Sequence, residues 1–336
     1  MTIKDLARLS GYSLGTVSRV LNNQPNVSEK ARAAILKIVE EQGFELNVNA
    51  QTLKQQRSNS VLIVVKGTAN EMFASLVERL QTLFLKTVHP LIVDFIDEDD
   101  NEVRRAVQLC RERKPMGILF LGGNNANFLQ DFDKILIPAV VVTNDASGLP
   151  FSNLSSVTTD DCCGAASAVE YLIRAGHRNI AVLGGDRRLS DTSLHRYDGC
   201  VEAFRRSGLV FDEQKMYVTG RYSYEFGYDG MQQILRQMPD VTAVFAMADV
   251  IAIGAMRALA DCGLRVPEDI SVIGYDGLKI GSFYTPKLST ITQPIDQLAS
   301  SSFELLMACM TAGAPACHIT VPFTLSCKQS VRQLSK

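Results

Sequence analysis

The sequence predicts a small all-α unit at the N-terminus, followed by an α/β body with two doubly wound parallel sheets. Apolar residues recur with helical spacing in the first forty residues or so. From Val61 onward, apolar runs typical of buried strands alternate with helical stretches, which indicates parallel sheets covered by helices. At 336 residues, two sheets of similar size are favoured over one very large sheet.

Two short helices joined by a tight turn are predicted first. Thr2 can cap a helix over residues 3–9, with Asp5 near its positive end. Gly11 ends this helix and Ser13 can start the next, which together form a helix-turn-helix pattern.

A third helix is predicted from Ser28 to Gly43. Its apolar stripe closes a small core and consists of Ala31, Ala34, Ile35, Ile38 and Val39.

The second helix has an apolar face, where Val17, Val20 and Leu21 lie together. The groups around that face are small or hydrogen-bonding: Leu14, Gly15, Thr16, Ser18, Arg19 and Asn22. Short hydroxyls, an amide and one arginine suit the base edges of a major groove with phosphates beside them. From pattern alone, the alternative is a three-helix bundle with no nucleic-acid role.

Three separated motifs narrow this choice: TIKDLA at residues 2–7, TVSRVLN at 16–22 and NVSEKAR at 26–32. Together they closely resemble the headpiece of the lactose/galactose-repressor (LacI/GalR) family of bacterial transcription factors. Residues 175–181 and 263–276 look like the body of the same family, which is shared with periplasmic sugar-binding proteins of type I. The resemblance runs from Thr2 to about Val331.

The resemblance implies three parts: a headpiece over residues 1–46, a hinge or linker over 47–59, and an effector-binding and dimerisation domain over 60–336. Within that domain, lobe 1 covers about 60–158 and 292–321, and lobe 2 about 159–291 and 322–336. The DNA contacts that helix pattern and resemblance together predict are Thr2, Leu14, Gly15, Thr16, Ser18, Arg19, Asn22, Asn26, Ser28, Asn49, Ala50 and Leu53.

The hinge is polar, with Leu53 as its single leucine, and its composition alone also fits a flexible linker. In the family, this segment becomes a short helix only on operator DNA, pairs with its twin and inserts a leucine into the central minor groove. Leu53 stands at that position. Such a wedge kinks the duplex at a cost of roughly a few kcal/mol, which wider contact offsets. Ala50 matches the family pattern, whereas Gln51 replaces the usual arginine and puts one contact in doubt.

The strands and helices of the body follow from apolar runs and helical periods. In the first half, strands are predicted at 61–65, 91–95, 117–121 and 139–142, and helices at 71–86, 102–113 and 128–134. In the second half, helices at 164–175, 194–207, 227–237 and 251–262 alternate with strands at 180–183, 216–219, 243–246 and 270–275. Extended stretches at 288–291 and 319–321 are expected to cross between lobes, and helix 298–310 to belong with the first lobe.

Ligands of open α/β sheets lie beyond the carboxyl ends of the strands. Polar and aromatic residues near those ends are therefore candidate ligand contacts: Phe73, Asp145, Arg196, Tyr222, Asp249 and Asp276. The resemblance to the family implies effector contacts at Arg196, Asp249 and Asp276 as well, and it alone adds Asp160, which stands in the family's second-lobe entry motif. Carboxylates and a guanidinium bind neighbouring hydroxyls, and an aromatic face covers the apolar side of a sugar ring. The expected effector is therefore a sugar or sugar phosphate.

Each of these candidates has a structural alternative. Asp145 and Asp249 can equally be helix N-caps. Arg196 and Asp276 can pair with one another, and Tyr222 can pack on a neighbouring aromatic side chain.

Charge is divided unevenly along the chain. Residues 1–57 hold eight Lys or Arg and five Asp or Glu, whereas the remainder holds 26 and 31. A cationic end on an anionic body suits a module that touches phosphates. The eight cysteines contain no Cys-x-x-Cys and are expected to be reduced thiols.

Several classes of function are disfavoured. Nothing in the sequence matches a metal cluster, a cofactor fingerprint or an activated nucleophile, so we expect no enzyme and no cofactor. No apolar run approaches the roughly 20 residues of a membrane span. Residues 1–20 lack a signal-peptide layout, so we expect a cytoplasmic protein without a membrane partner.

The expected function is a sequence-specific DNA-binding transcriptional regulator, most often a repressor in this family, that is controlled by a small-molecule effector. It would bind a near-palindromic operator as a homodimer. A dimer is favoured over a tetramer because the sequence shows no leucine-heptad tail before Lys336. The alternative is a sugar-binding transport receptor of the same two-lobe fold, which would need a signal peptide and would have no use for the headpiece.

Overall fold

The computed structural model describes residues 3–21, 27–42, 58–68 and 70–334. It divides the chain into two compact units, Met1–Gln56 and Arg57–Lys336. The predicted hinge, up to residue 57, lies outside the described residues. So do six of the predicted DNA contacts: Thr2, Asn22, Asn26, Asn49, Ala50 and Leu53.

The N-terminal unit contains the three predicted helices, α1 (Ile3–Ser10), α2 (Leu14–Leu21) and α3 (Glu29–Glu41). Gly11 follows α1 at φ +70°, the left-handed conformation that commonly ends a helix, and its N–H donates to Ala7 O at 3.1 Å. The Ser28 hydroxyl caps α3 by accepting from Ala31 N at 3.4 Å. The buried core of the unit is formed by Leu6, Val17, Val20 and Ile35.

The first lobe of the body is built on a six-stranded sheet in the order β11-β5-β4-β3-β1-β2, with every neighbouring pair parallel. Its strands are β1 (Val61–Lys66), β2 (Leu91–Ile96), β3 (Gly117–Leu121), β4 (Ala139–Val142), β5 (Leu154–Thr159) and β11 (His318–Val321). The helices of this lobe are α5 (Glu71–Phe84), α6 (Glu102–Arg113), α7 (Asn125–Asp131), the 3₁₀ turn η1 (Phe132–Lys134) and α13 (Ile295–Ala312).

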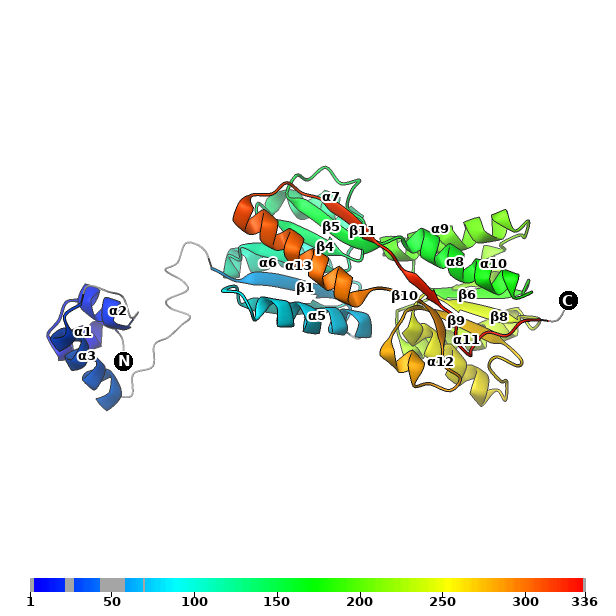
Figure 1. Cartoon of the computed structure of the whole chain (residues 1–336), viewed down its shortest axis with the longest axis horizontal. Coiled ribbons are helices and arrows are strands. Elements are labelled where there is room, and N and C mark those ends of the chain that lie inside the picture. The colour runs from blue at the N-terminus through cyan, green and yellow to red at the C-terminus, as the bar shows by residue number, and fades with distance from the viewer. Residues whose placement is uncertain (1–2, 22–26, 43–57, 69, 335–336) are drawn as a thin grey trace. The chain divides into compact units, whose positions relative to one another are not determined.

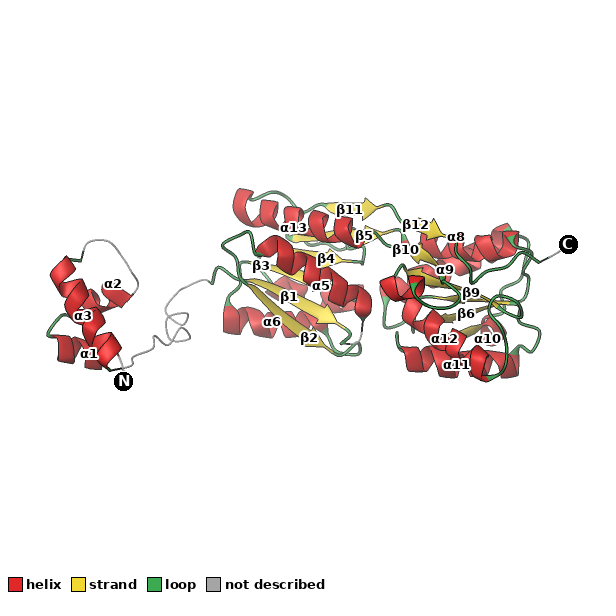
Figure 2. Cartoon of the chain, turned by 60° about the horizontal axis from the view of Figure 1, so that its bottom comes forward, coloured by secondary structure: helices red, strands yellow, loops and turns green. Residues whose placement is uncertain are grey.

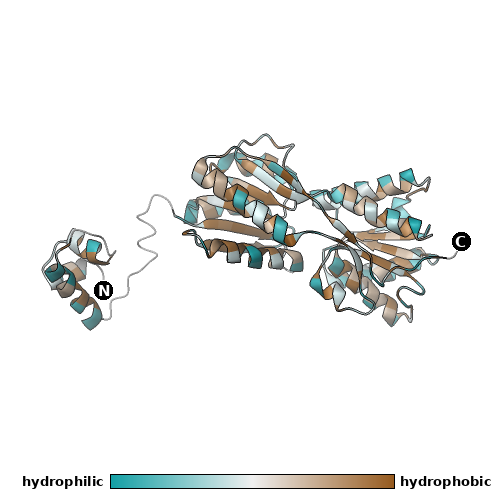
Figure 3. Cartoon of the chain, viewed as in Figure 1, coloured by the Kyte–Doolittle hydropathy of each residue, from teal (hydrophilic) through white to brown (hydrophobic). Residues whose placement is uncertain are grey.

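Both faces of this sheet are covered, which explains why β1 reads as an unbroken apolar run. Ile63 and Val65 join one hydrophobic cluster, with residues of α5 and α13, and Leu62 and Val64 join another, with residues of α6 and α7. The helices flank the sheet in Figure 2, and the strands are the most hydrophobic part of the fold in Figure 3.

The second lobe repeats the plan with the order β12-β10-β9-β8-β6-β7, in which only β12 is antiparallel to its neighbour. Its strands are β6 (Ile180–Gly184), β7 (Tyr217–Thr219), β8 (Ala243–Ala246), β9 (Ser271–Asp276), β10 (Ser289–Thr292) and β12 (Thr324–Ser326). Its helices are α8 (Asp161–Arg174), α9 (Asp191–Arg206), α10 (Glu213–Met216), α11 (Tyr224–Gln237), α12 (Asp249–Asp261) and the 3₁₀ turn η2 (Lys279–Ser282). In Figure 1, α8 and α9 lie on one side of this sheet and α11 and α12 on the other.

Two strands were missed by the sequence analysis, β5 and β12. β5 reads Leu-Ser-Ser-Val-Thr-Thr, and its hydroxyls, although buried, hide the apolar signal of a buried strand. β12 has three residues and gains its extended conformation by pairing with β10. The chain crosses between lobes three times: after β5, after β10 and between β11 and β12.

Candidate functional site

The predicted reading helix α2 keeps its apolar face inside the headpiece, where Val17 and Val20 are buried. On its other sides, Leu14, Gly15 and Arg19 are exposed, and Thr16 and Ser18 are half-buried. These five predicted DNA contacts therefore share a helix whose surface is open to a partner. The Ser13 hydroxyl accepts from Thr16 N at 3.2 Å and fixes the start of α2, so the turn and the helix are held as one unit.

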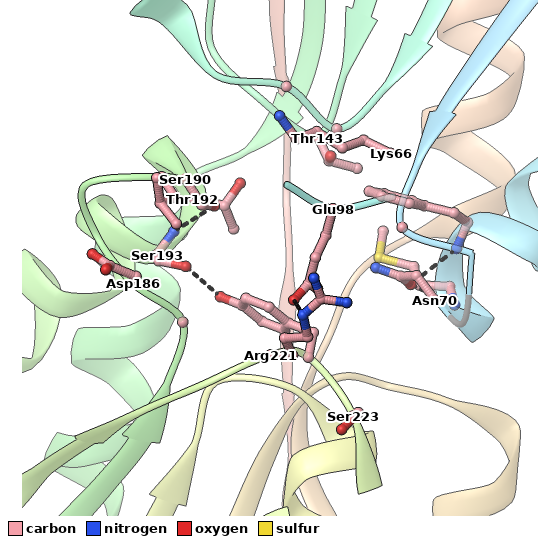
Figure 4. A pocket seen from close by; sticks show the side chains of 18 of the residues that line it. Lys66, Asn70, Glu98, Thr143, Asp186, Ser190, Thr192, Ser193, Arg221 and Ser223 are labelled. Carbon is pink, nitrogen blue, oxygen red and sulfur yellow. Dashed lines mark hydrogen bonds and ion pairs between the residues drawn. The ribbon is translucent and has the colours of Figure 1, made fainter. Parts of the chain in front are cut away.

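A cleft of about 470 Å³ lies between the two lobes of the body. Its walls come from the loops that follow β1, β2, β3 and β4 in the first lobe and β6, β7 and β9 in the second. These are the carboxyl ends of both sheets, as expected for doubly wound folds. Figure 4 shows lining side chains from both lobes facing one another, with Lys66 and Thr143 on one side and Asp186 and Ser193 on another. Of the seven predicted ligand contacts, Phe73, Arg196, Tyr222 and Asp276 line this cleft.

Arg196 is buried at the bottom of the cleft, with 4% of its side chain exposed. Its Nε donates to Asp161 Oδ1 at 2.8 Å, and its Nη1 donates to the carbonyl of Met247. The guanidinium also lies 3.7 Å from the centre of the Tyr275 ring. Burial works against the charged form, but the charge of Asp161 raises the pKa of Arg196 above its ordinary value, so this group is permanently cationic.

Asp276 ends β9 with φ +110°, a conformation that L-residues rarely adopt and that tends to occur at functional sites. Its Oδ1 accepts from Gln293 Nε2 at 2.9 Å and lies 3.7 Å from Arg196 Nη2. Gln293 in turn accepts from the Thr159 hydroxyl at 2.9 Å, which links both lobes. Burial raises the pKa of Asp276 to about 6, although Arg196 opposes this shift.

Aromatic side chains form part of the wall. The Tyr222 hydroxyl and the Ser193 hydroxyl lie 2.8 Å apart, which orients the tyrosine ring. Gly185 makes room for this pair, since a Cβ there would lie 2.4 Å from Ser193 Oγ and 2.6 Å from the Tyr222 ring. Phe73, which is 8% exposed, contributes from the first turn of α5.

The other three predicted contacts do not line the cleft. Asp145 is exposed and accepts hydrogen bonds from Ser147, so it holds a surface turn. Asp160 is exposed and caps α8 by accepting from Cys163 N at 2.8 Å. In this structure both carboxylates lie outside the cleft lining and are engaged in local chain geometry, so direct ligand contact by these two residues stays a prediction.

Asp249 lies fully buried beneath the cleft, in the first turn of α12. Its Oδ2 accepts from Leu278 N and its Oδ1 from the Thr290 hydroxyl, both at 2.6 Å. Burial, followed by the charge of Asp276, raises the pKa of Asp249 to about 8. The residue ties the loop after Asp276 to the neighbouring strand β10, so it positions the cleft floor and is not part of the cleft lining.

Direct contacts join the two lobes around the cleft. Arg221, in the loop after β7, forms ion pairs with Asp97, Glu98 and Asp99, which follow β2 in the first lobe. The Tyr224 hydroxyl donates to the Glu71 carboxylate. These contacts hold the lobes against one another in this structure.

Several lining residues were not predicted. Arg221, Gln293 and the acidic turn at residues 97–99 line the cleft directly after strand ends. The same position after a strand that identified Asp276 could have identified them. Thr143 lines the cleft with φ +77°, which no sequence pattern indicates.

Two negative findings apply to the described part of the chain. Residues 3–21, 27–42, 58–68 and 70–334 contain no group of three or more His, Cys, Asp or Glu that could hold a metal ion. Within the same ranges, no helix combines the length and the apolar character that crossing a bilayer requires.

Comparisons with known proteins agree with this architecture. A family model described as "Bacterial regulatory proteins, lacI family" matches residues 2–47, and a model described as "Periplasmic binding protein-like domain" matches residues 169–331. The HTH-type transcriptional regulator MalR of Clostridium butyricum is 32% identical over 322 residues, which cover 95% of this chain and 96% of that protein. The HTH-type transcriptional repressor PurR of Pectobacterium carotovorum subsp. carotovorum is 31% identical over 323 residues, which cover 95% and 93%.

Two solved structures share the whole fold. The lac repressor dimer bound to operator and the anti-inducer ONPF aligns with a TM-score of 0.78 at 25% identity and covers 99% of both chains. The complex of the transcriptional regulator CelR with cellobiose aligns with a TM-score of 0.72 at 26% identity, covering 98% of this chain and 99% of that one.

A helix-turn-helix headpiece on a two-lobed body with an inter-lobe cleft defines a DNA-binding transcriptional regulator that carries a small-molecule site. This chain belongs to the lacI family of bacterial regulatory proteins. The transport-receptor alternative receives no support, because the match over residues 2–47 is to a regulatory DNA-binding domain.

Proposed function

We propose that this protein is a repressor that binds a near-palindromic operator as a homodimer and responds to a sugar held between its lobes. The observation that carries the proposal is the Arg196–Asp276 pair, which is buried in the second lobe at the floor of a cleft bordered by the carboxyl ends of both sheets. The relatives support the rest, since one solved neighbour is a repressor dimer on its operator and another is a complex with cellobiose.

The DNA-binding half of the proposal rests on α2. In a dimer, two such helices enter successive major grooves, about one helical turn apart, which gives the operator its near-palindrome. Leu14, Gly15 and Arg19 are exposed on this helix and would meet bases or phosphates. Ser28, which caps α3, is the last of the predicted DNA contacts that lie within the described residues. Thr2, Asn22, Asn26, Asn49, Ala50 and Leu53 are added because they match the family's motifs.

The proposal that a sugar binds in the cleft rests on the hydrogen-bond donors and acceptors at the cleft floor. Arg196 Nη2 lies 3.7 Å from Asp276 Oδ1, longer than a hydrogen bond, so two neighbouring hydroxyls of a sugar can reach a donor and an acceptor. The ring of Tyr222 can cover the apolar side of the sugar. The cleft volume of about 470 Å³ falls within the usual range for small-molecule sites.

Control of DNA binding follows from the position of the cleft. A ligand that touches both lobes favours the arrangement in which they close on it, and the first lobe is the one that follows the hinge in sequence. The lobes already touch one another in this structure, through Arg221 with Asp97 and Tyr224 with Glu71. A sugar that adds contacts to both lobes would strengthen one arrangement of the lobes over others, and couplings of this kind typically amount to about 1–3 kcal/mol.

The proposal also covers catalysis and location. The protein carries out no catalysis on its effector, in keeping with a family of DNA-binding regulators and with a cleft whose Arg196 and Asp276 suit binding. It acts in the cytoplasm, where its operator lies.

A gel-shift assay tests the proposal. Purified protein is titrated onto the promoter region of its own gene, with and without a panel of sugars. We expect a salt-sensitive shift on one near-palindromic site, and a change in that shift with at least one sugar. In Arg196→Met, the shift should persist while the sugar response disappears, whereas Arg205→Met, exposed on α9, should behave as wild type. No shift on any nearby palindrome would refute the function.

A further inference from the structure

The three cationic side chains that line the cleft are already matched by carboxylates. Lys66 Nζ lies 2.6 Å from Glu102 Oε2, and these side chains are 11% and 1% exposed. Glu102 also accepts from Asn124 N at 2.7 Å. This lysine is thus held in a largely buried pair and has no excess positive charge to offer an anionic ligand.

Arg196 faces two carboxylates. Asp161 Oδ1 accepts from its Nε at 2.8 Å, and Asp276 Oδ1 lies 3.7 Å from its Nη2. The two carboxylates are nearly as buried as the guanidinium, at 6% and 9% exposure. At the floor of the cleft, one guanidinium therefore lies beside two carboxylates.

Arg221 faces three carboxylates at the rim. Its Nη2 lies 2.9 Å from Asp97 Oδ1, its Nε lies 3.2 Å from Glu98 Oε1, and Asp99 completes the group. Figure 4 shows Arg221 beside Glu98 among the lining side chains. Burial raises the pKa of Glu98, and the charges of Asp97 and Asp99 add to this shift, although Arg221 opposes it.

Neither Asp186, the remaining acidic residue of the lining, nor the helix N-termini on the cleft wall provide an unpaired cationic group for an anionic ligand. Asp186 is paired with Arg188, whose hydrogen bond holds the pKa of Asp186 down to about 2. Helix N-termini commonly bind phosphate through free backbone N–H groups. At the N-termini of three helices on the cleft wall, a side-chain oxygen already accepts a hydrogen bond from one of these backbone N–H groups. Asn70 accepts from Phe73 N, Ser190 from Ser193 N, and Ser223 from Phe226 N.

We propose that this cleft binds an uncharged sugar and rejects the phosphorylated or carboxylated form of the same sugar. The inference rests on the proposed function and narrows the effector class. A phosphate or uronate entering the cleft meets carboxylates in excess of guanidinium groups, and like charges at such an interface cost several kcal/mol. Neutral hydroxyls are favoured by the same groups, because the carboxylates accept hydrogen bonds from them and the guanidinium donates hydrogen bonds to their oxygens.

The first experiment compares matched pairs. Neutral mono- and disaccharides, their phosphates and the corresponding uronates are screened against the full chain by thermal shift, and the hits are titrated by calorimetry. We expect at least one neutral sugar to raise the melting temperature by mass action, and its phosphate to bind about 100-fold more weakly. A phosphate or uronate that binds as tightly as its neutral parent overturns the inference. So does a panel in which no neutral sugar binds.

The second experiment removes the carboxylates around Arg221. The triple variant D97N/E98Q/D99N leaves this guanidinium without its three partners, so the affinity for a sugar phosphate should rise about tenfold relative to the affinity for its neutral parent. The ratio is compared because the lost inter-lobe contacts affect both ligands. The matched control is Asp261→Asn, which frees Arg257 on α12 at the surface of the second lobe. An equal ratio of the two affinities in the triple variant and the control overturns the role assigned to these carboxylates.

A wrong charge preference and a wrong function give different experimental results. If only the charge preference is wrong, the protein still shifts its operator and still responds to a ligand, but that ligand is an anion. If the proposed function is wrong, the operator shift itself is absent.

Discussion

Asp249 predicts a specific dependence of stability on pH. Its carboxyl is fully buried, and its pKa is about 8 in the folded protein against an ordinary value of 3.8. The folded state therefore keeps a proton that the unfolded state has lost at pH values between these two. Stability falls as pH rises through this window, by about 1.4 kcal/mol per pH unit for one proton, and the fall ends above the folded pKa.

The perturbation is Asp249→Asn. Asparagine keeps the shape, can accept from Leu278 N with its oxygen, and can donate to the Thr290 hydroxyl oxygen as a protonated carboxyl would. Between about pH 6.5 and 8.5, this group should lower the free energy of unfolding of the wild type by about 2 kcal/mol. In the variant, residue 249 should contribute no such decrease. This window lies above the pKa of about 6 for Asp276 and avoids His177, whose burial holds its pKa below the ordinary value.

The assay is urea unfolding of the full chain, followed by circular dichroism at both pH values. Groups that titrate in both proteins cancel in the difference between the two pH dependences, so the comparison isolates residue 249. Asp160→Asn, which keeps an N-cap side chain at an exposed position, should show the wild-type dependence. Equal pH dependences in wild type and Asp249→Asn would refute the argument that this buried carboxyl is protonated near neutrality.

Three further outcomes are expected. Arg19→Ala should weaken binding across many DNA sequences and reduce the slope of log affinity against log salt by about 1, if its contact is to phosphate; unchanged operator affinity would exclude this contact. Leu53→Ala should abolish operator bending, measured by the mobility of permuted DNA fragments, while the helical circular dichroism of the headpiece persists; normal bending would remove the wedge. Arg196→Met should lower stability by about 3–5 kcal/mol in urea unfolding, because Asp161 and Asp276 stay buried without their partner; a loss under about 1 kcal/mol would mean that their protonation compensates.

The sequence determined the local elements wherever one residue type or one period dominates. Gly11 ended the first helix because the left-handed conformation it adopts costs glycine little. The unbroken apolar run at β1 predicted a strand buried on both faces, and both faces are covered. Arg196 and Asp276 were identified because their motif and their place after strands coincide, and the cleft brings them together.

Only the tertiary structure decided which polar residues after strands face the cleft. Asp276 is the last residue of β9 and Asp249 comes shortly after β8, yet Asp249 lies under the cleft floor, where it accepts hydrogen bonds from Leu278 N and the Thr290 hydroxyl. Its carboxylate is turned inward at the start of α12. The pairing of Arg221 with the acidic turn at Asp97 joins residues 124 positions apart on different lobes. No local pattern records such a contact, since it depends on how two separately folded sheets meet. The charge balance of the cleft is therefore a property of the folded body, whereas its helices and strands follow largely from the order of residues along the chain.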